Sequence, residues 1–294
     1  MSEPRVATFG GCQINGPIRT LHAQRRVVPV YRQIGFRSTP FVFTPQAALQ
    51  LVRFCSGEQR IPREVREFCY SDPELEPQPS AYRHIREADV VLLEPNTAID
   101  VLFGEYYLNP NIVQQLVVER IRENDAKLGK LVRRWKADGI LKQNEEIRAE
   151  TARQLLDQLP TETVSDRMIR ELIRDCRGRR SYQDDLFRQV VELREILPVP
   201  TGVVLYTFQY MPDGRAVSWP PEFKDDMTAV ARKLGLRCYD PSAIVMRYGV
   251  DVSLREDMRH FKDEFYPVVG EVLIDYMQEI RSAARPAREL ATAY

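Results

Sequence analysis

The sequence RVATFGGCQINGP, residues 5–17, predicts a strand, a tight turn and the start of a helix in direct succession. Arg5–Phe9 is short, apolar and prone to β structure, and Gly10-Gly11 interrupts it. Asn15-Gly16-Pro17 is a helix-start signal, because proline is well tolerated in the first turn of a helix. A strand that leads at once into a helix is the building unit of α/β proteins with parallel sheets.

Strand-like and helix-like segments alternate further along the chain. Ala88–Leu93 (ADVVLL) is an almost continuous apolar run, typical of a strand buried in a parallel sheet. Phe41–Phe43 and Thr201–Tyr210 are also predicted to be strands. Gln46–Cys55 and Pro267–Ile280 carry apolar residues at helical spacing. The alternation predicts an α/β three-layer sandwich with a mostly parallel sheet.

The middle of the chain has a different character. Between about Asn109 and Leu197, charged residues of both signs alternate and apolar residues recur at helical spacing, which predicts three or four helices. We interpret residues 105–198 as a helical insertion in an α/β domain made of residues 1–104 and 199–294. Four arginines of the insertion are interpreted as a solvated turn between helices, with phosphate binding, for example of a coenzyme A tail, as the alternative: Arg174, Arg177, Arg179 and Arg180.

The composition argues against several classes of protein. Lys plus Arg and Asp plus Glu both number 42, so the chain is not expected to bind nucleic acid. No apolar run approaches the roughly 18 residues that cross a bilayer, and the first residues lack the pattern of a signal peptide. Five scattered cysteines without a CxxC pair predict neither disulfides nor a metal site, and we expect a cytoplasmic location. Whether the chain forms a homo-oligomer stays open.

Three polar blocks follow predicted strands or precede the last predicted helix. They are Gly10–Gln13, Glu94-Pro95-Asn96 and Asp257–His260. In an open parallel sheet, ligands bind at the carboxyl ends of the strands. We therefore expect these blocks to meet in one site.

The residue types in these blocks fit nucleophilic catalysis. Cys12 lies where a helix begins, and the positive end of the helix dipole is expected to lower the pKa of its thiol. His260 is the candidate base, with Asp257 three residues earlier to orient its imidazole. Asn96 and the Cys12 N–H are the candidate oxyanion donors.

Neighbours of the thiol are candidate substrate contacts: Gly11, Gln13 and Asn15. Each has a structural alternative. Gln13 can brace the turn instead, Asn15 can cap the helix, and Gly11 can serve the tight turn alone.

The order of these blocks resembles the SGNH (GDSL-like) hydrolase superfamily, whose fold is flavodoxin-like. Cys12 stands at the position of the family's serine, and Asp257 with His260 matches its Asp-x-x-His pair. The Gly-x-Cys-Gln motif is most similar to that of the WcbI-type branch, SGNH-fold proteins of capsular polysaccharide biosynthesis. That resemblance implies coenzyme A binding and acetyl transfer. The similarity covers about residues 5–100 and 200–283.

The hypothesis is therefore an acyltransferase with a Cys-His-Asp site. It takes coenzyme A as the small-molecule acyl donor and passes the acyl group to a sugar-like or other hydroxyl acceptor. A cysteine esterase or thioesterase of the SGNH type is one alternative. A non-catalytic binding module is another, because no second-block glycine is identifiable and Glu94-Pro95-Asn96 replaces the family's Gly-x-Asn.

Overall fold

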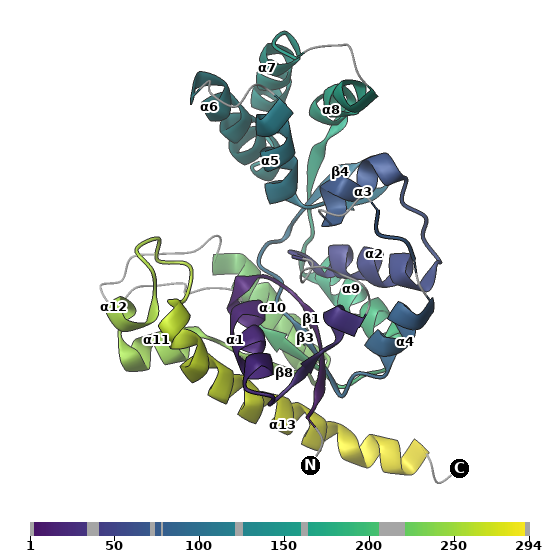
Figure 1. The fold of residues 1–294 in the computed structure, drawn as a ribbon, viewed down its shortest axis with the longest axis vertical. Helices are drawn as coiled ribbons and strands as arrows, with labels where there is room; N and C mark the ends of the chain where they lie inside the picture. Colours follow the sequence, from purple (N-terminus) through teal and green to yellow (C-terminus); the bar gives the residue numbers. More distant parts are fainter. Residues whose placement is uncertain are drawn as a thin grey trace. The chain divides into compact units, whose positions relative to one another are not determined.

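The structure is a computed structural model that describes seven ranges of the chain: 3–33, 41–70, 74–77, 79–120, 126–159, 164–205 and 221–291. Two compact units emerge from its contacts. The first comprises Met1–Gly57, Pro77–Ala98 and Tyr182–Tyr294. The second comprises Glu58–Glu76 and Ile99–Ser181. Figure 1 shows the course of the chain through both units.

The first unit is built on a five-stranded parallel sheet. Its order is β2-β1-β3-β7-β8, and every neighbouring pair is parallel. The strands are β1 (Arg5–Phe9), β2 (Val28–Pro29), β3 (Val90–Leu93), β7 (Thr201–Val204) and β8 (Arg237–Tyr239). Strands β3 and β7 are buried along their whole length, because helices cover both faces of the sheet. The predicted three-layer α/β architecture is confirmed.

Helices α1 (Cys12–Ala23) and α13 (Tyr266–Ala291) pack against each other and cover one face of this sheet (Figure 1). Alternate residues of the strands point into this layer, among them Val6, Val90 and Leu92. The intervening residues point to the other face. The remaining helices of the unit include α2 (Pro45–Ser56), α4 (Pro79–Arg86), α9 (Gln183–Ile196) and α10 (Pro221–Lys233), which pack on one another.

Three short segments lead into α13. These are α11 (Ser242–Tyr248), α12 (Val250–Ser253) and a 3₁₀ turn at Asp263–Phe265. Another 3₁₀ turn, Val30–Gln33, follows β2. The described helices do not include one that is long and apolar enough to cross a membrane.

The second unit has an antiparallel sheet of order β5-β4-β6. Its strands are β4 (Ile99–Phe103), β5 (Tyr106–Leu108) and β6 (Arg177–Arg180). Its helices are α3 (Arg63–Tyr70), α5 (Pro110–Arg120), α6 (Ala126–Arg134), α7 (Glu145–Leu156) and α8 (Val164–Asp175), with a π-helix at Trp135–Leu141. Helix α9, which the sequence analysis assigned to the insertion, groups with the first unit.

Three of the four clustered arginines lie in a strand rather than the predicted turn, and Arg174 lies near the end of α8. Arg177, Arg179 and Arg180 lie on β6, which pairs with β4 from Ile99 to Leu102. The Arg179 guanidinium donates to the Tyr107 hydroxyl at 2.8 Å and lies 3.6 Å from the buried Asp100 carboxylate. Pairing with β4 overrides the poor strand propensity of these residues.

Other boundaries also differ from the prediction. Helix α1 begins at Cys12, before the Asn15-Gly16-Pro17 signal, because the Glu94 carboxyl accepts N–H groups of its first turn. In place of the strand predicted at Phe41–Phe43, only Phe41 forms an isolated bridge, to Gly10. The predicted strand Thr201–Tyr210 is seen over Thr201–Val204, and residues 206–210 lie outside the described ranges.

Helix α13 lies directly on β7 and β8. The Tyr276 hydroxyl is 2.9 Å from the Val203 carbonyl oxygen and 2.7 Å from that of Arg237, so it joins the helix to both strands. A Cβ on Gly202 would overlap the Ile280 side chain and lie 2.6 Å from the Tyr276 hydroxyl oxygen. Only glycine permits this close approach.

We therefore expect Gly202→Ala to destabilise the protein by about 1–3 kcal/mol, because α13 must move away from β7. Urea unfolding measures the loss. Gly129→Ala in α6 is the matched control, since a Cβ there meets no atom within 4 Å. Equal stability of the Gly202→Ala variant and the unmodified protein would contradict this packing.

Candidate functional site

Strand register brings the first two polar blocks together. Strands β1 and β3 are neighbours, with Phe9 opposite Leu93, so Gly10-Gly11 and Glu94 emerge side by side at the carboxyl edge. The Asn96 N–H donates to the Phe43 carbonyl at 3.0 Å, and its side-chain nitrogen lies 3.6 Å from where a Gly11 Cβ would be. Asn96 is therefore next to the turn that precedes Cys12.

The Glu94 carboxyl lies beneath the first turn of α1. It is 0% exposed, and its Oε2 accepts the N–H groups of Gly11 at 3.1 Å and Ile14 at 3.0 Å. Burial raises the pKa of Glu94 to about 8, although these N–H groups and that of Gln13 lower it. Its Oε1 is buried without a hydrogen-bond partner among the described residues. No role is predicted for Glu94 from the sequence, and its place directly after a buried strand was the available signal.

Cys12 is the half-buried first residue of α1. Burial raises the pKa of its thiol to about 12, and the negative charge of Glu94 adds to the effect. The N–H group of Cys12 and the positive charge of Arg255 lower the pKa of this thiol, but by less. The predicted net lowering of the thiol pKa is therefore wrong, because burial of the thiol and the charge of Glu94 outweigh the lowering by the N–H group at the start of the helix.

Asp257 and His260 form a compact turn. One carboxylate oxygen of Asp257 accepts the N–H groups of Arg259 and His260, at 3.0 and 3.1 Å. The other lies 2.5 Å from Nδ1 of His260, as the Asp-x-x-His spacing predicts. Met258 takes a left-handed conformation, with φ 59°, to close the turn.

The electrostatics of this turn favour an ionised Asp257. Burial raises the pKa of the Asp257 carboxyl, yet the hydrogen bonds from the His260 side chain and the two backbone N–H groups together lower it to about 2. The side chains of His260 and Asp257 are 41% and 46% exposed, so the imidazole is accessible from solvent. With Nδ1 held by the carboxylate, Nε2 is the nitrogen available to take a proton.

A short hairpin presents this turn from the core. Leu254 bridges Phe261 in antiparallel fashion, and the Arg255 N–H donates to the His260 carbonyl at 2.8 Å. The Phe261 ring is buried and anchors the hairpin to the layer of α13. The hairpin that carries the imidazole is therefore anchored in the core through Phe261.

The turn and the start of α1 are in contact. The Gln13 side chain donates to the Arg259 carbonyl at 3.4 Å, and Asp257 and Arg255 both influence the Cys12 thiol electrostatically. The contact therefore joins the residue after Cys12 to the residue before His260.

The predicted substrate contacts have internal partners. Gln13 and Asn15 are only 2% and 3% exposed, and the Asn15 amide donates to the Gly10 carbonyl at 3.2 Å. The Gly11 N–H is engaged by Glu94. These bonds brace the turn, and contact of the three residues with a substrate stays a prediction.

Tyr266 was missed by the sequence analysis. It is the first residue of α13, and its ring lies against α1, where a Gly16 Cβ would come within 2.6 Å of it. Burial raises the pKa of Tyr266, and Cys12 is among the groups that add to this effect. The aromatic residue therefore lies near the thiol.

The other candidate groups of the sequence do not gather here. Cys55, Cys69 and Cys176 are buried and Cys238 is exposed, and these four cysteines, all within the described ranges, form no disulfide. Nδ1 of His22 contacts the Val27 carbonyl oxygen at 3.1 Å. Among the residues that the structure describes, His, Cys, Asp and Glu form no group of three that could hold a metal ion.

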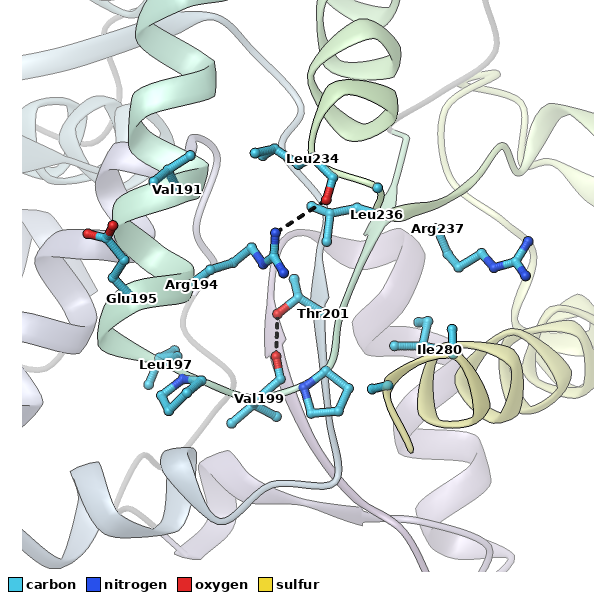
Figure 2. A pocket seen from close by; sticks show the side chains of 15 residues that line it. Val191, Arg194, Glu195, Leu197, Val199, Thr201, Leu234, Leu236, Arg237 and Ile280 are labelled. Carbon is cyan, nitrogen blue, oxygen red and sulfur yellow. Dashed lines mark hydrogen bonds between the residues drawn. The ribbon is translucent and has the colours of Figure 1, made fainter. Parts of the chain in front are cut away.

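A separate cleft of about 660 Å³ lies at the opposite edge of the sheet. Figure 2 shows Thr201 and Arg237, the first residues of β7 and β8, on its wall, with Ile280 of α13 beside them. Arg194 donates to the Leu234 carbonyl at 3.3 Å across it. Because it is at the amino ends of these strands, the cleft is not part of the site at their carboxyl ends.

The fold and this edge define an α/β protein with polar residues gathered where parallel strands end. The family model of the TviD N-terminal domain matches residues 4–276, so the chain belongs to that family. The matched range includes every candidate site residue from Gly11 to His260. Membership connects the chain with polysaccharide biosynthesis. Neither the curated proteins nor the solved structures give a significant match.

Burial of Glu94 makes the stability of the fold depend on pH. Its folded-state pKa of about 8 lies above the ordinary 4.5, so its contribution is fully present below about pH 4.5 and is lost as the pH rises through about 8. Between these values the free energy of unfolding should fall by about 1.4 kcal/mol per pH unit relative to Glu94→Gln.

Urea unfolding of the unmodified protein and Glu94→Gln across this pH range measures the difference in slope. Glu222→Gln removes an exposed carboxylate of the same unit and should keep the slope of the unmodified protein. Identical slopes for the unmodified protein and Glu94→Gln would exclude a buried neutral Glu94.

Proposed function

We propose that this chain is an acyl-transfer enzyme in which Cys12 is the nucleophile, His260 the general base and acid, and Asp257 the residue that orients His260. The donor is an acyl-coenzyme A, and the acceptor is a hydroxyl group of a sugar-like molecule. The observation that carries the proposal is the Asp257–His260 contact of 2.5 Å, in a turn linked to the Cys12 turn by Gln13.

In the first half-reaction, the thiol of Cys12 attacks the carbonyl carbon of the thioester. Because the pKa of this thiol is about 12, the sulfur is protonated at rest, and Nε2 of His260 must take the proton during attack. A carbon–sulfur bond forms to Cys12 and the carbonyl electrons move onto oxygen. When the carbonyl re-forms, the coenzyme A thiolate leaves with the proton from His260, and Cys12 is left acylated.

In the second half-reaction, His260 takes the proton of the acceptor hydroxyl, and the oxygen attacks the acyl carbon. The ester forms, the bond to sulfur breaks, and the proton returns to Cys12. Asn96 and the Cys12 N–H are the proposed donors to the oxyanion in both steps. The N–H groups of Gly11, Gln13 and Ile14 face Glu94 instead, which leaves that of Cys12 for this role.

The connection of the family with polysaccharide biosynthesis is compatible with a hydroxyl group as the acceptor. A polysaccharide carries many hydroxyl groups, and acylation of a hydroxyl is a modification that the pathway of such a polymer can use. The same site with water as acceptor would be an esterase or thioesterase.

Intact-mass spectrometry after incubation with a panel of acyl thioesters tests the proposal. We expect one acyl group on Cys12, no such adduct in Cys12→Ala, and acylation slowed about 10²–10⁴-fold in His260→Ala. Peptide mapping separates Cys12 from the exposed Cys238, which reports non-specific acylation and is removed in the control Cys238→Ala.

The fate of the adduct separates the transferase from its rivals. A transferase keeps the acyl group until a sugar hydroxyl is added, whereas a hydrolase loses it to water. Coenzyme A binding without an adduct on folded protein would indicate a binding module and refute the enzymatic proposal, as would equal acylation rates in His260→Ala and the unmodified protein.

A further inference from the structure

Glu94 is a fully buried acidic residue that the proposed acyl transfer does not use. Its side chain follows β3 and accepts N–H groups from both ends of the turn that carries Cys12, at Gly11 and Ile14. A carboxyl group in this position fixes the turn, since each donor would otherwise be buried without a partner.

The two glycines before Cys12 are fitted to this carboxyl group. A Cβ on Gly10 would overlap the Cβ of Glu94 and lie 2.8 Å from the Ile14 side chain. A Cβ on Gly11 would lie 3.1 Å from Oε1 of Glu94. The Gly10-Gly11 pair therefore allows β1 and α1 to close over Glu94, and the position of Cys12 depends on that closure.

We propose that Glu94 is a positioning residue for Cys12, which holds the first turn of α1 in its neutral form and suppresses the reactivity of the thiol when it ionises. The inference deepens the proposed function and rests on it only in taking Cys12 as the nucleophile. Its physical basis is the shared burial of two groups that would both become negative.

The charge balance at this spot supports the proposal. Burial raises the pKa of Glu94 to about 8, so the carboxyl group is largely neutral at pH 7. From α1, Cys12 is the titratable group coupled to it. From the hairpin before α13, Asp257 and Arg255 act on Cys12, and Tyr266 at the start of α13 is coupled to the same thiol.

The consequence is an unusual pH dependence. The reactivity of an ordinary cysteine rises with pH as its thiolate forms. At Cys12 the same rise in pH ionises Glu94, and the new negative charge raises the pKa of the thiol. The gain in thiolate above about pH 8 should therefore be smaller than at a cysteine without such a neighbour.

Alkylation by iodoacetamide measures this effect without any acyl donor. Glu94→Gln keeps the shape of the side chain and an oxygen that accepts the N–H groups, but it cannot ionise. We expect equal alkylation rates of Cys12 in the two proteins near pH 7. Near pH 9 the rate in Glu94→Gln should be about tenfold higher, as for a thiol pKa one unit lower.

Two controls accompany the comparison. Cys238 is exposed and reports the alkylation rate of a thiol outside the site in the same molecule. Glu222→Gln removes an exposed carboxylate of the same unit and should leave the Cys12 profile unchanged. Peptide mapping by mass spectrometry follows each cysteine separately, and circular dichroism shows that the variants are folded.

Matching Cys12 profiles in Glu94→Gln and the unmodified protein would overturn the proposal. If Glu94→Gln does not fold, the unmodified protein decides alone: a Cys12 rate that rises as steeply as that of Cys238 above about pH 8 overturns it, and a flatter rise supports it. If Cys12 is acylated but its two alkylation profiles match, the inference about Glu94 is overturned and the proposed function stands. If the two alkylation profiles differ but Cys12 is never acylated, the proposed function is overturned and the inference about Glu94 stands.

Discussion

The contact between the buried carboxyl of Glu94 and the first turn of α1 is the interaction on which the candidate site depends. It joins the ends of two neighbouring parallel strands, because the Gly11 and Ile14 N–H groups that follow β1 are satisfied by a side chain that follows β3. The same contact sets the local electrostatics. A helix start favours a thiolate at Cys12, but burial of the thiol and the charge of Glu94 outweigh this effect and raise the pKa of the thiol to about 12.

This arrangement distinguishes the site from one with a preformed thiolate. The pKa of the Cys12 thiol is raised to about 12, so the proposed attack by sulfur requires proton transfer in the same step, as for a serine nucleophile. The pKa of Asp257 is lowered to about 2, and its carboxylate holds the imidazole of His260 through a contact within three residues of the chain, so the orientation of the imidazole does not depend on the thiol. Gln13 then connects the two parts through the Arg259 carbonyl.

The parts of the structure that the sequence predicts are those set by local pattern. The apolar runs of β1 and β3 are buried strands because their neighbours on both faces are apolar helices, and Asp257 reaches His260 because the two are close along the chain. The strand β6 could not be predicted, since four residues of the sequence RGRR are strand-like only beside β4. The contact of Glu94 was equally hidden, because its partners lie 83 and 80 residues away and the register of β1 and β3 alone brings them together.

The division of the chain into two units has a consequence for how the protein folds. The segment Ile99–Ser181 separates β3 from β7, which pair in the centre of the parallel sheet. The two halves that bear the sulfur and the imidazole must therefore find each other across a long excursion of the polypeptide, and non-local pairing of this kind slows folding. Early folding of Ile99–Ser181 would shorten the flexible loop between β3 and β7. The entropic cost of pairing these two strands would then be smaller.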